Sequence, residues 1–110
     1  MPTYLVTYHG DGGAPPTPPP TPEAREQVEA AFGAWVASVG DAMVDPGAPL
    51  AASKSVSSTG SKDGPASGPI GGYTLVRATN LDAAVQLVAQ HPFIARGGTL
   101  QVSEAVNLSG

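Results

Sequence analysis

Prolines between residues 14 and 22 place the strongest single constraint on how this chain can fold. In the run Ala14-Pro-Pro-Thr-Pro-Pro-Pro-Thr-Pro22 most residues have no backbone N–H and a fixed φ, which excludes a helix interior and favours extended polyproline II. We interpret the segment as a stiff connector. A docking site for another protein is the alternative, because PxxP spacing binds aromatic grooves, although no flanking Arg or Lys strengthens that interpretation.

Regular patterns flank this connector. The run Thr3–Tyr8 is rich in β-branched and aromatic side chains and is followed by glycines, which predicts a first strand ending in a turn. Thr21 as N-cap and Pro22 at the first helical position predict the start of a helix. Its apolar stripe has helical spacing and comprises Ala24, Val28, Ala31, Phe32, Trp35, Val36 and Val39.

Two glycines bear on this first helix. Gly40 is expected to end it. Gly33 lies inside it at a cost of about 1 kcal/mol relative to Ala, which indicates close packing at that position.

The middle of the chain has weaker patterns. Residues 42–44 predict a short strand that the prolines and glycine of residues 46–49 interrupt, and residues 53–58 predict a weak polar strand. Residues 57–72 contain five Gly, four Ser and two Pro, a composition that predicts a flexible loop.

Order returns in the last third of the chain. Residues 72–78 predict a strand, and a second helix follows with its stripe at Leu81, Ala84, Val85 and Val88. Its start is capped either by a box of Thr79 with Asp82 or by Asn80. The pair His91-Pro92 ends it, and residues 99–106 alternate as a last strand.

Two helices between four strands predict an α+β fold, a ferredoxin-like βαββαβ unit with both helices on one face of an antiparallel sheet. At 110 residues we expect one domain, residues 1–110, with the connector at 14–22 and the flexible loop at 57–72. The other sheet face remains bare, so we predict a homodimer packed face to face through the sheets.

Composition excludes several functions. The chain has no cysteine, which rules out zinc-thiolate and iron–sulfur sites, and its net charge of -4 with scattered Lys and Arg argues against nucleic-acid binding. No apolar run approaches the roughly 20 residues of a membrane helix, and no secretory signal is present, so we expect a cytoplasmic protein without a membrane partner. No cofactor is predicted.

Several motifs resemble one known family. Lys62-Asp-Gly-Pro-Ala66, Ile70-Gly-Gly-Tyr-Thr-Leu-Val76, Leu81-Asp-Ala-Ala-Val85 and Ala89-Gln-His-Pro92 resemble YCII-related proteins of the DGPF-motif subgroup, although Ala66 stands where that motif has phenylalanine. The resemblance implies a dimeric α/β barrel of ferredoxin-like subunits, mostly without assigned reactions. It also aligns Glu29 with a histidine on the first helix of the broader family.

Two residues are candidates for catalysis. His91 has a side chain that titrates near neutrality and could move a proton, and Asp63 could orient it across a cleft. The alternative roles are structural, because a histidine at a helix C-terminus caps carbonyls and the Asp of an Asp-Gly-Pro sequence holds a turn.

Tyr8, Trp35 and Glu29 are the candidates for ligand binding. Tyr8 presents a hydroxyl from the first strand, Trp35 is expected to form core or pocket wall, and Glu29 could act as a base if buried. His9 and His91 lack the spacing of a metal site, so no metal is predicted. We therefore expect a dimeric small-molecule-binding or accessory module, and the alternative is an enzyme that uses His91 and Asp63 in acid–base chemistry.

Overall fold

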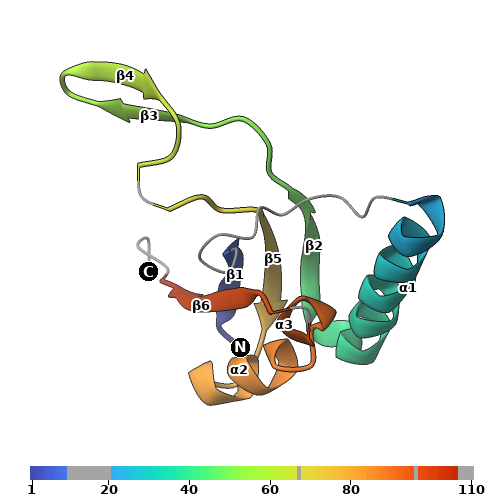
Figure 1. Ribbon diagram of the computed structural model, residues 1–110. Coiled ribbons are helices and arrows are strands. Elements are labelled where there is room, and N and C mark those ends of the chain that lie inside the picture. The colour runs from blue at the N-terminus through green and yellow to red at the C-terminus, as the bar shows by residue number, and fades with distance from the viewer. Residues whose placement is uncertain (10–20, 67, 96, 107–110) are drawn as a thin grey trace.

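The computed structural model describes residues 1–9, 21–66, 68–95 and 97–106 and has a ferredoxin-like α+β fold (Figure 1). Its main sheet is antiparallel, with strand order β2-β5-β1-β6. These strands are β1 (Thr3–His9), β2 (Met43–Pro49), β5 (Gly72–Arg77) and β6 (Thr99–Ala105). The predicted fold class is confirmed.

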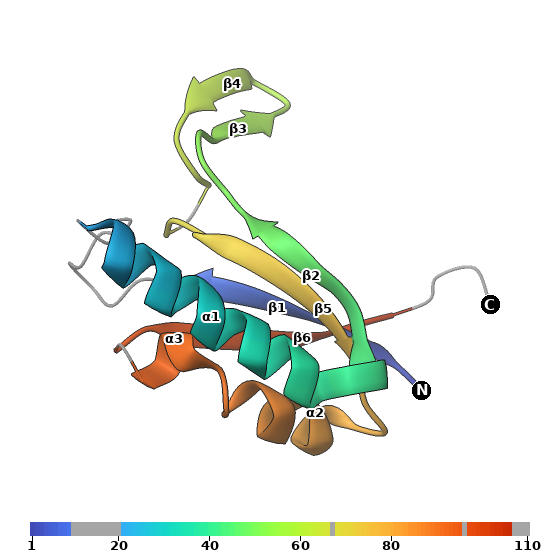
Figure 2. The same ribbon diagram turned by 90° about the vertical axis from the view of Figure 1, so that its right-hand side faces the viewer.

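Helices cover one face of this sheet, as Figure 2 shows. They are α1 (Pro22–Val39), α2 (Leu81–Val88) and the short α3 (Pro92–Ala95), and the single turn η1 (Gly40–Ala42) follows α1. None of these helices combines the length and apolar character that crossing a bilayer requires, among the residues described.

The core lies between the sheet and the helices. Tyr4 and Val6 of β1 and Val76 of β5 are completely buried there, because alternate strand residues point to the same face. Trp35 of α1 and Val88 of α2 close the core from the helix side. This arrangement follows from the apolar stripes of the sequence.

The helix ends follow from local chemistry. Helix α1 begins at Pro22, as predicted, and ends before Gly40, whose φ of 63° suits glycine. The Asn80 side chain caps α2 by accepting a hydrogen bond of 2.8 Å from the Ala83 N–H, so Asn80 is the cap rather than the box of Thr79 and Asp82.

Strand β2 is longer than the sequence predicted. It continues through residues 46–49, with two irregularities in its register against β5. Asp45 accepts a hydrogen bond of 2.8 Å from the Gly47 N–H, and Gly47 has a φ of 78°, so the chain forms a bulge and then resumes pairing. Prolines are tolerated because β2 is an edge strand of the main sheet.

Residues 57–72, predicted as a flexible loop, contain a second strand of a hairpin. Strands β3 (Lys54–Ser57) and β4 (Gly60–Asp63) pair with each other and project from the main sheet (Figure 1). Strand β4 could not be predicted from the sequence, because all four of its residues are exposed and show no apolar alternation. Backbone pairing with β3 holds it in the hairpin instead. The connector at 14–22 lies outside the described residues except for Thr21 and Pro22.

Gly33 corrects another prediction. It is exposed, and a Cβ added there would meet nothing within 4 Å, so the close packing inferred from the sequence is wrong. Gly47 is the opposite case, because a Cβ there would overlap the Tyr73 carbonyl oxygen.

We expect the two glycines to respond in opposite directions to alanine. Gly33→Ala should raise the free energy of unfolding by about 1 kcal/mol, since alanine is the better helix former in open space. Gly47→Ala should lower it by more than about 1 kcal/mol, because positive φ and the clash with Tyr73 both oppose a side chain. Urea unfolding measures both, and equal responses would contradict the bulge.

Candidate functional site

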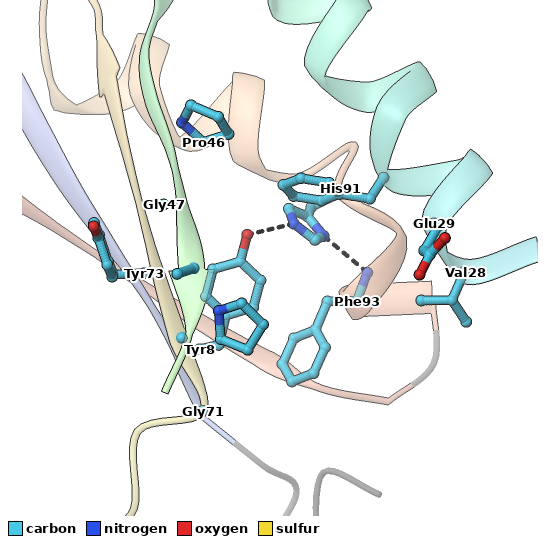
Figure 3. A pocket seen from close by; sticks show the side chains of 13 residues that line it. Tyr8, Val28, Glu29, Pro46, Gly47, Gly71, Tyr73, His91 and Phe93 are labelled. Atoms are coloured by element: carbon cyan, nitrogen blue, oxygen red, sulfur yellow. Dashed lines mark hydrogen bonds between the residues drawn. The ribbon is translucent and has the colours of Figure 1, made fainter. Parts of the chain in front are cut away.

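A cavity of about 370 Å³ opens between the helix face of the sheet and helices α1 and α3 (Figure 3). Its walls come from Tyr8 of β1, from residues 28, 29 and 32 of α1, and from residues 46–49 of β2. His91 and Phe93 close it beside α3. The bulge in β2 therefore forms one wall of the cavity.

His91 lies buried at the back of this cavity, with 3% of its surface exposed. Its backbone N–H donates to the Val88 carbonyl at 2.9 Å, and Pro92 then starts α3, which turns the chain back toward the sheet. Figure 3 shows the Tyr8 hydroxyl directed at one side of the imidazole and the Phe93 backbone nitrogen directed at the other.

Aromatic rings surround this imidazole. The Trp35 ring centroid lies 4.4 Å from that of His91, and the Tyr8 ring meets His91 edge-on at 5.0 Å. Phe32 lies at 5.6 Å. Trp35 is itself anchored, because its indole N–H donates to the Leu87 carbonyl at 2.9 Å. The imidazole is thus held by packing as well as by hydrogen bonds.

A chain of hydrogen bonds runs from α3 across the sheet. The Phe93 N–H donates to His91 Nδ1 at 2.9 Å, and His91 Nε2 lies 2.6 Å from the Tyr8 hydroxyl oxygen. The Tyr8 hydroxyl lies 2.8 Å from Thr74 Oγ1, and the Thr74 hydroxyl donates to the Pro46 carbonyl at 2.9 Å. These bonds connect α3, β1, β5 and β2.

The two ends of this chain determine the position of every hydrogen in it. A backbone N–H only donates, so His91 Nδ1 accepts, and the neutral ring carries its hydrogen on Nε2. A carbonyl only accepts, so the Thr74 hydroxyl hydrogen points to Pro46, and Tyr8 must donate to Thr74. His91 therefore donates to Tyr8.

Burial raises the pKa of Tyr8 above the ordinary 10.0, and the hydrogen bond with Thr74 lowers it by a smaller amount. The phenol is therefore neutral near pH 7. Because a raised folded-state pKa stabilises only the protonated form, this contribution to stability is present below pH 10.0 and is lost as the pH rises further.

The structure brings three of the predicted site residues together at the cavity. Tyr8, His91 and Glu29 line it, with Glu29 exposed on α1. Trp35 is buried and packs behind His91 rather than on the cavity surface.

Asp63, predicted to orient His91, has a different partner. It lies on β4 and forms an ion pair of 3.1 Å with Lys54, with both side chains mostly exposed. The position that the sequence assigned to Asp63 beside His91 is taken by Tyr8 in this structure.

His9 lies on the sheet face opposite Tyr8, because adjacent strand residues point to opposite faces. Its Nε2 lies 2.8 Å from Thr7 Oγ1. Among the residues described, no three His, Asp or Glu side chains are grouped as a metal site would require.

Sequence reasoning missed Thr74, Phe93 and the Pro46 carbonyl. Thr74 occupies a buried position in a predicted strand, where a single hydroxyl among apolar neighbours was the available signal. Pro46 read as a strand breaker, and its carbonyl reaches Thr74 only because of the bulge.

Comparison with known proteins gives a fold likeness. No family model matches the chain, and no curated protein matches it. Among solved structures the chain is similar to 5-chloro-2-hydroxyhydroquinone dehydrochlorinase (TftG) from Burkholderia phenoliruptrix AC1100, in complex with 2,5-dihydroxybenzoquinone. The TM-score is 0.51 at 16% identity, over 90% of each chain. This fold is compatible with the YCII-related resemblance, which remains a prediction.

We expect Tyr8→Phe to lower the free energy of unfolding by about 1–3 kcal/mol at pH 7, because it strands the His91 Nε2–H and Thr74 Oγ1. Tyr73→Phe is the matched control, since the Tyr73 hydroxyl points away from the cavity (Figure 3). The difference between wild type and Tyr8→Phe should shrink as the pH rises above 10.0. Thermal unfolding across pH measures this, and equal losses in both variants would contradict the hydrogen-bond chain.

Proposed function

We propose that this protein is a small-molecule-binding module that holds a ring-sized, largely apolar ligand against Tyr8 and His91. The observation that carries the proposal is the cavity of about 370 Å³, which falls within the range of volumes typical of ligand sites. Aromatic and apolar side chains line it, and a few polar groups converge at its back, which is the usual composition of such sites.

The hydrogen-bond pattern favours binding over proton transfer. Nδ1 of His91 accepts from the Phe93 N–H, and Nε2 carries a hydrogen directed at Tyr8, so neither nitrogen offers a lone pair to a ligand in this arrangement. The series of hydrogen bonds also ends at the Pro46 carbonyl, which cannot pass a proton onward. These groups are arranged to hold a fixed geometry.

An enzyme using acid–base chemistry is the alternative. It is supported by the dehydrochlorinase named above, whose fold is similar and whose structure contains a substituted benzoquinone. It is weakened by the ion pair that occupies Asp63 on the hairpin. If catalysis occurs here, Tyr8 and His91 are the groups positioned to carry it.

We expect single-ring compounds to bind in the cavity and Val28→Trp to abolish that binding. Val28 is a half-buried wall residue on α1, and an indole there would fill the space. Val85→Trp is the control, because Val85 is 47% exposed on α2, outside the described lining. A metabolite panel screened by thermal shift measures binding, which raises Tm by mass action. Tm shifts that persist in Val28→Trp would contradict this site.

A separate observation supports a homodimer through the bare sheet face. Leu5, which is 36% exposed, pairs across the strands with Leu75, and both point away from the helices. Tyr73 extends this apolar strip on β5. We propose that a second copy of the chain covers it, as the resemblance to YCII-related proteins implies.

Leu5→Glu should therefore shift the protein to monomers, because it places a charge in the centre of the proposed interface. Leu81→Glu is the matched control, since Leu81 is 46% exposed on α2, on the helix side of the sheet. Sedimentation equilibrium measures the mass. A wild-type chain that sediments as a monomer would refute the dimer.

A further inference from the structure

Among the residues that the structure describes, the cavity wall offers a ligand acceptors and aromatic faces but few hydrogens. From this we propose that it selects a ring-bearing amine in its protonated form over a carboxylate of the same size. The inference rests on the proposed function and names its ligand class.

The side-chain hydrogens at the back of the cavity are already committed. His91 Nε2–H donates to Tyr8, the Tyr8 hydroxyl donates to Thr74, and the Thr74 hydroxyl donates to a carbonyl. What Tyr8 has left for a ligand is a lone pair on its oxygen, because a phenolic oxygen can accept more than one hydrogen bond. A ligand atom that meets Tyr8 must therefore be a donor.

The nearby backbone is also poor in free donors. The Phe93 N–H is bonded to His91, the Gly47 N–H to the Asp45 carboxylate at 2.8 Å, and the Gly71 N–H to the Tyr8 carbonyl at 2.8 Å. Pro46 and Pro49 have no N–H at all. These described wall residues therefore provide no N–H for a carboxylate, which would lose its water contacts without replacement.

The charge and the aromatic faces of the cavity wall also favour a cationic ligand over an anionic one. Glu29 is exposed on the α1 wall, where its carboxylate accepts but cannot donate (Figure 3). Tyr8, Phe32 and Phe93 present rings to the cavity, and aromatic faces attract organic cations. The net charge of -4 adds a weak attraction of the same sign.

Three probes of matched size test the proposal: benzylamine, benzyl alcohol and benzoate, titrated into the full chain at pH 7 and low salt and followed by NMR. We expect benzylamine to bind most tightly and benzoate at least about tenfold more weakly, because the anion faces Glu29 and an acceptor oxygen. Benzoate binding as tightly as benzylamine would overturn the proposal.

Glu29→Gln should weaken benzylamine binding by about two- to fivefold and leave benzyl alcohol unchanged, because an exposed ion pair contributes little more than this. Glu26→Gln is the matched control, since it removes the same charge from the same helix outside the described lining. A loss of benzylamine affinity that is equal in both variants would assign the preference to net charge alone and refute the role of Glu29.

The outcomes separate the two proposals. If benzyl alcohol and benzoate bind in the cavity and benzylamine does not, the ligand class is wrong and the binding function stands. If none of the probes binds, and the metabolite panel also produces no Tm shift, the proposed function itself fails.

Discussion

The hydrogen bond from the Phe93 N–H to His91 Nδ1 is the constraint on which the rest of the site depends. It determines which nitrogen of the buried imidazole carries the hydrogen, and this in turn sets the direction of the bonds through Tyr8 and Thr74. One backbone donor thereby orients side chains on two strands. Each polar side-chain atom in this series of hydrogen bonds has a hydrogen-bond partner. The polar network therefore persists among aromatic side chains at little cost in free energy.

The bulge in β2 supplies the other end of this network. A regular edge strand would keep its carbonyls in the ladder or expose them to water. Here Asp45 holds the Gly47 N–H, the strand bends, and the Pro46 carbonyl meets Thr74. The same bend moves the segment 46–49 to the cavity wall. The irregularity that interrupts the strand pattern in the sequence thus builds the site.

Much of the fold could be predicted from the sequence, because apolar periodicity marks both main helices and the three strands at residues 3–9, 72–77 and 99–105. His91 and Tyr8 could be named as site residues from the sequence. His91 is a titratable side chain at the end of the second predicted helix, and Tyr8 carries a hydroxyl at the end of the first predicted strand. Their pairing could not be predicted, because they are 83 residues apart and only the strand order brings them together. Asp63 was misleading for a related reason: a turn motif shows a local structure but not which neighbours the turn will have.

Trp35 gives the molecule an intrinsic fluorescent probe beside the cavity. It is the single tryptophan of the chain, and its indole packs 4.4 Å from the imidazole at the back of the cavity. Its emission therefore comes from one known place. Fluorescence spectroscopy of the unlabelled protein should consequently follow occupancy of the cavity without a dye or a tag.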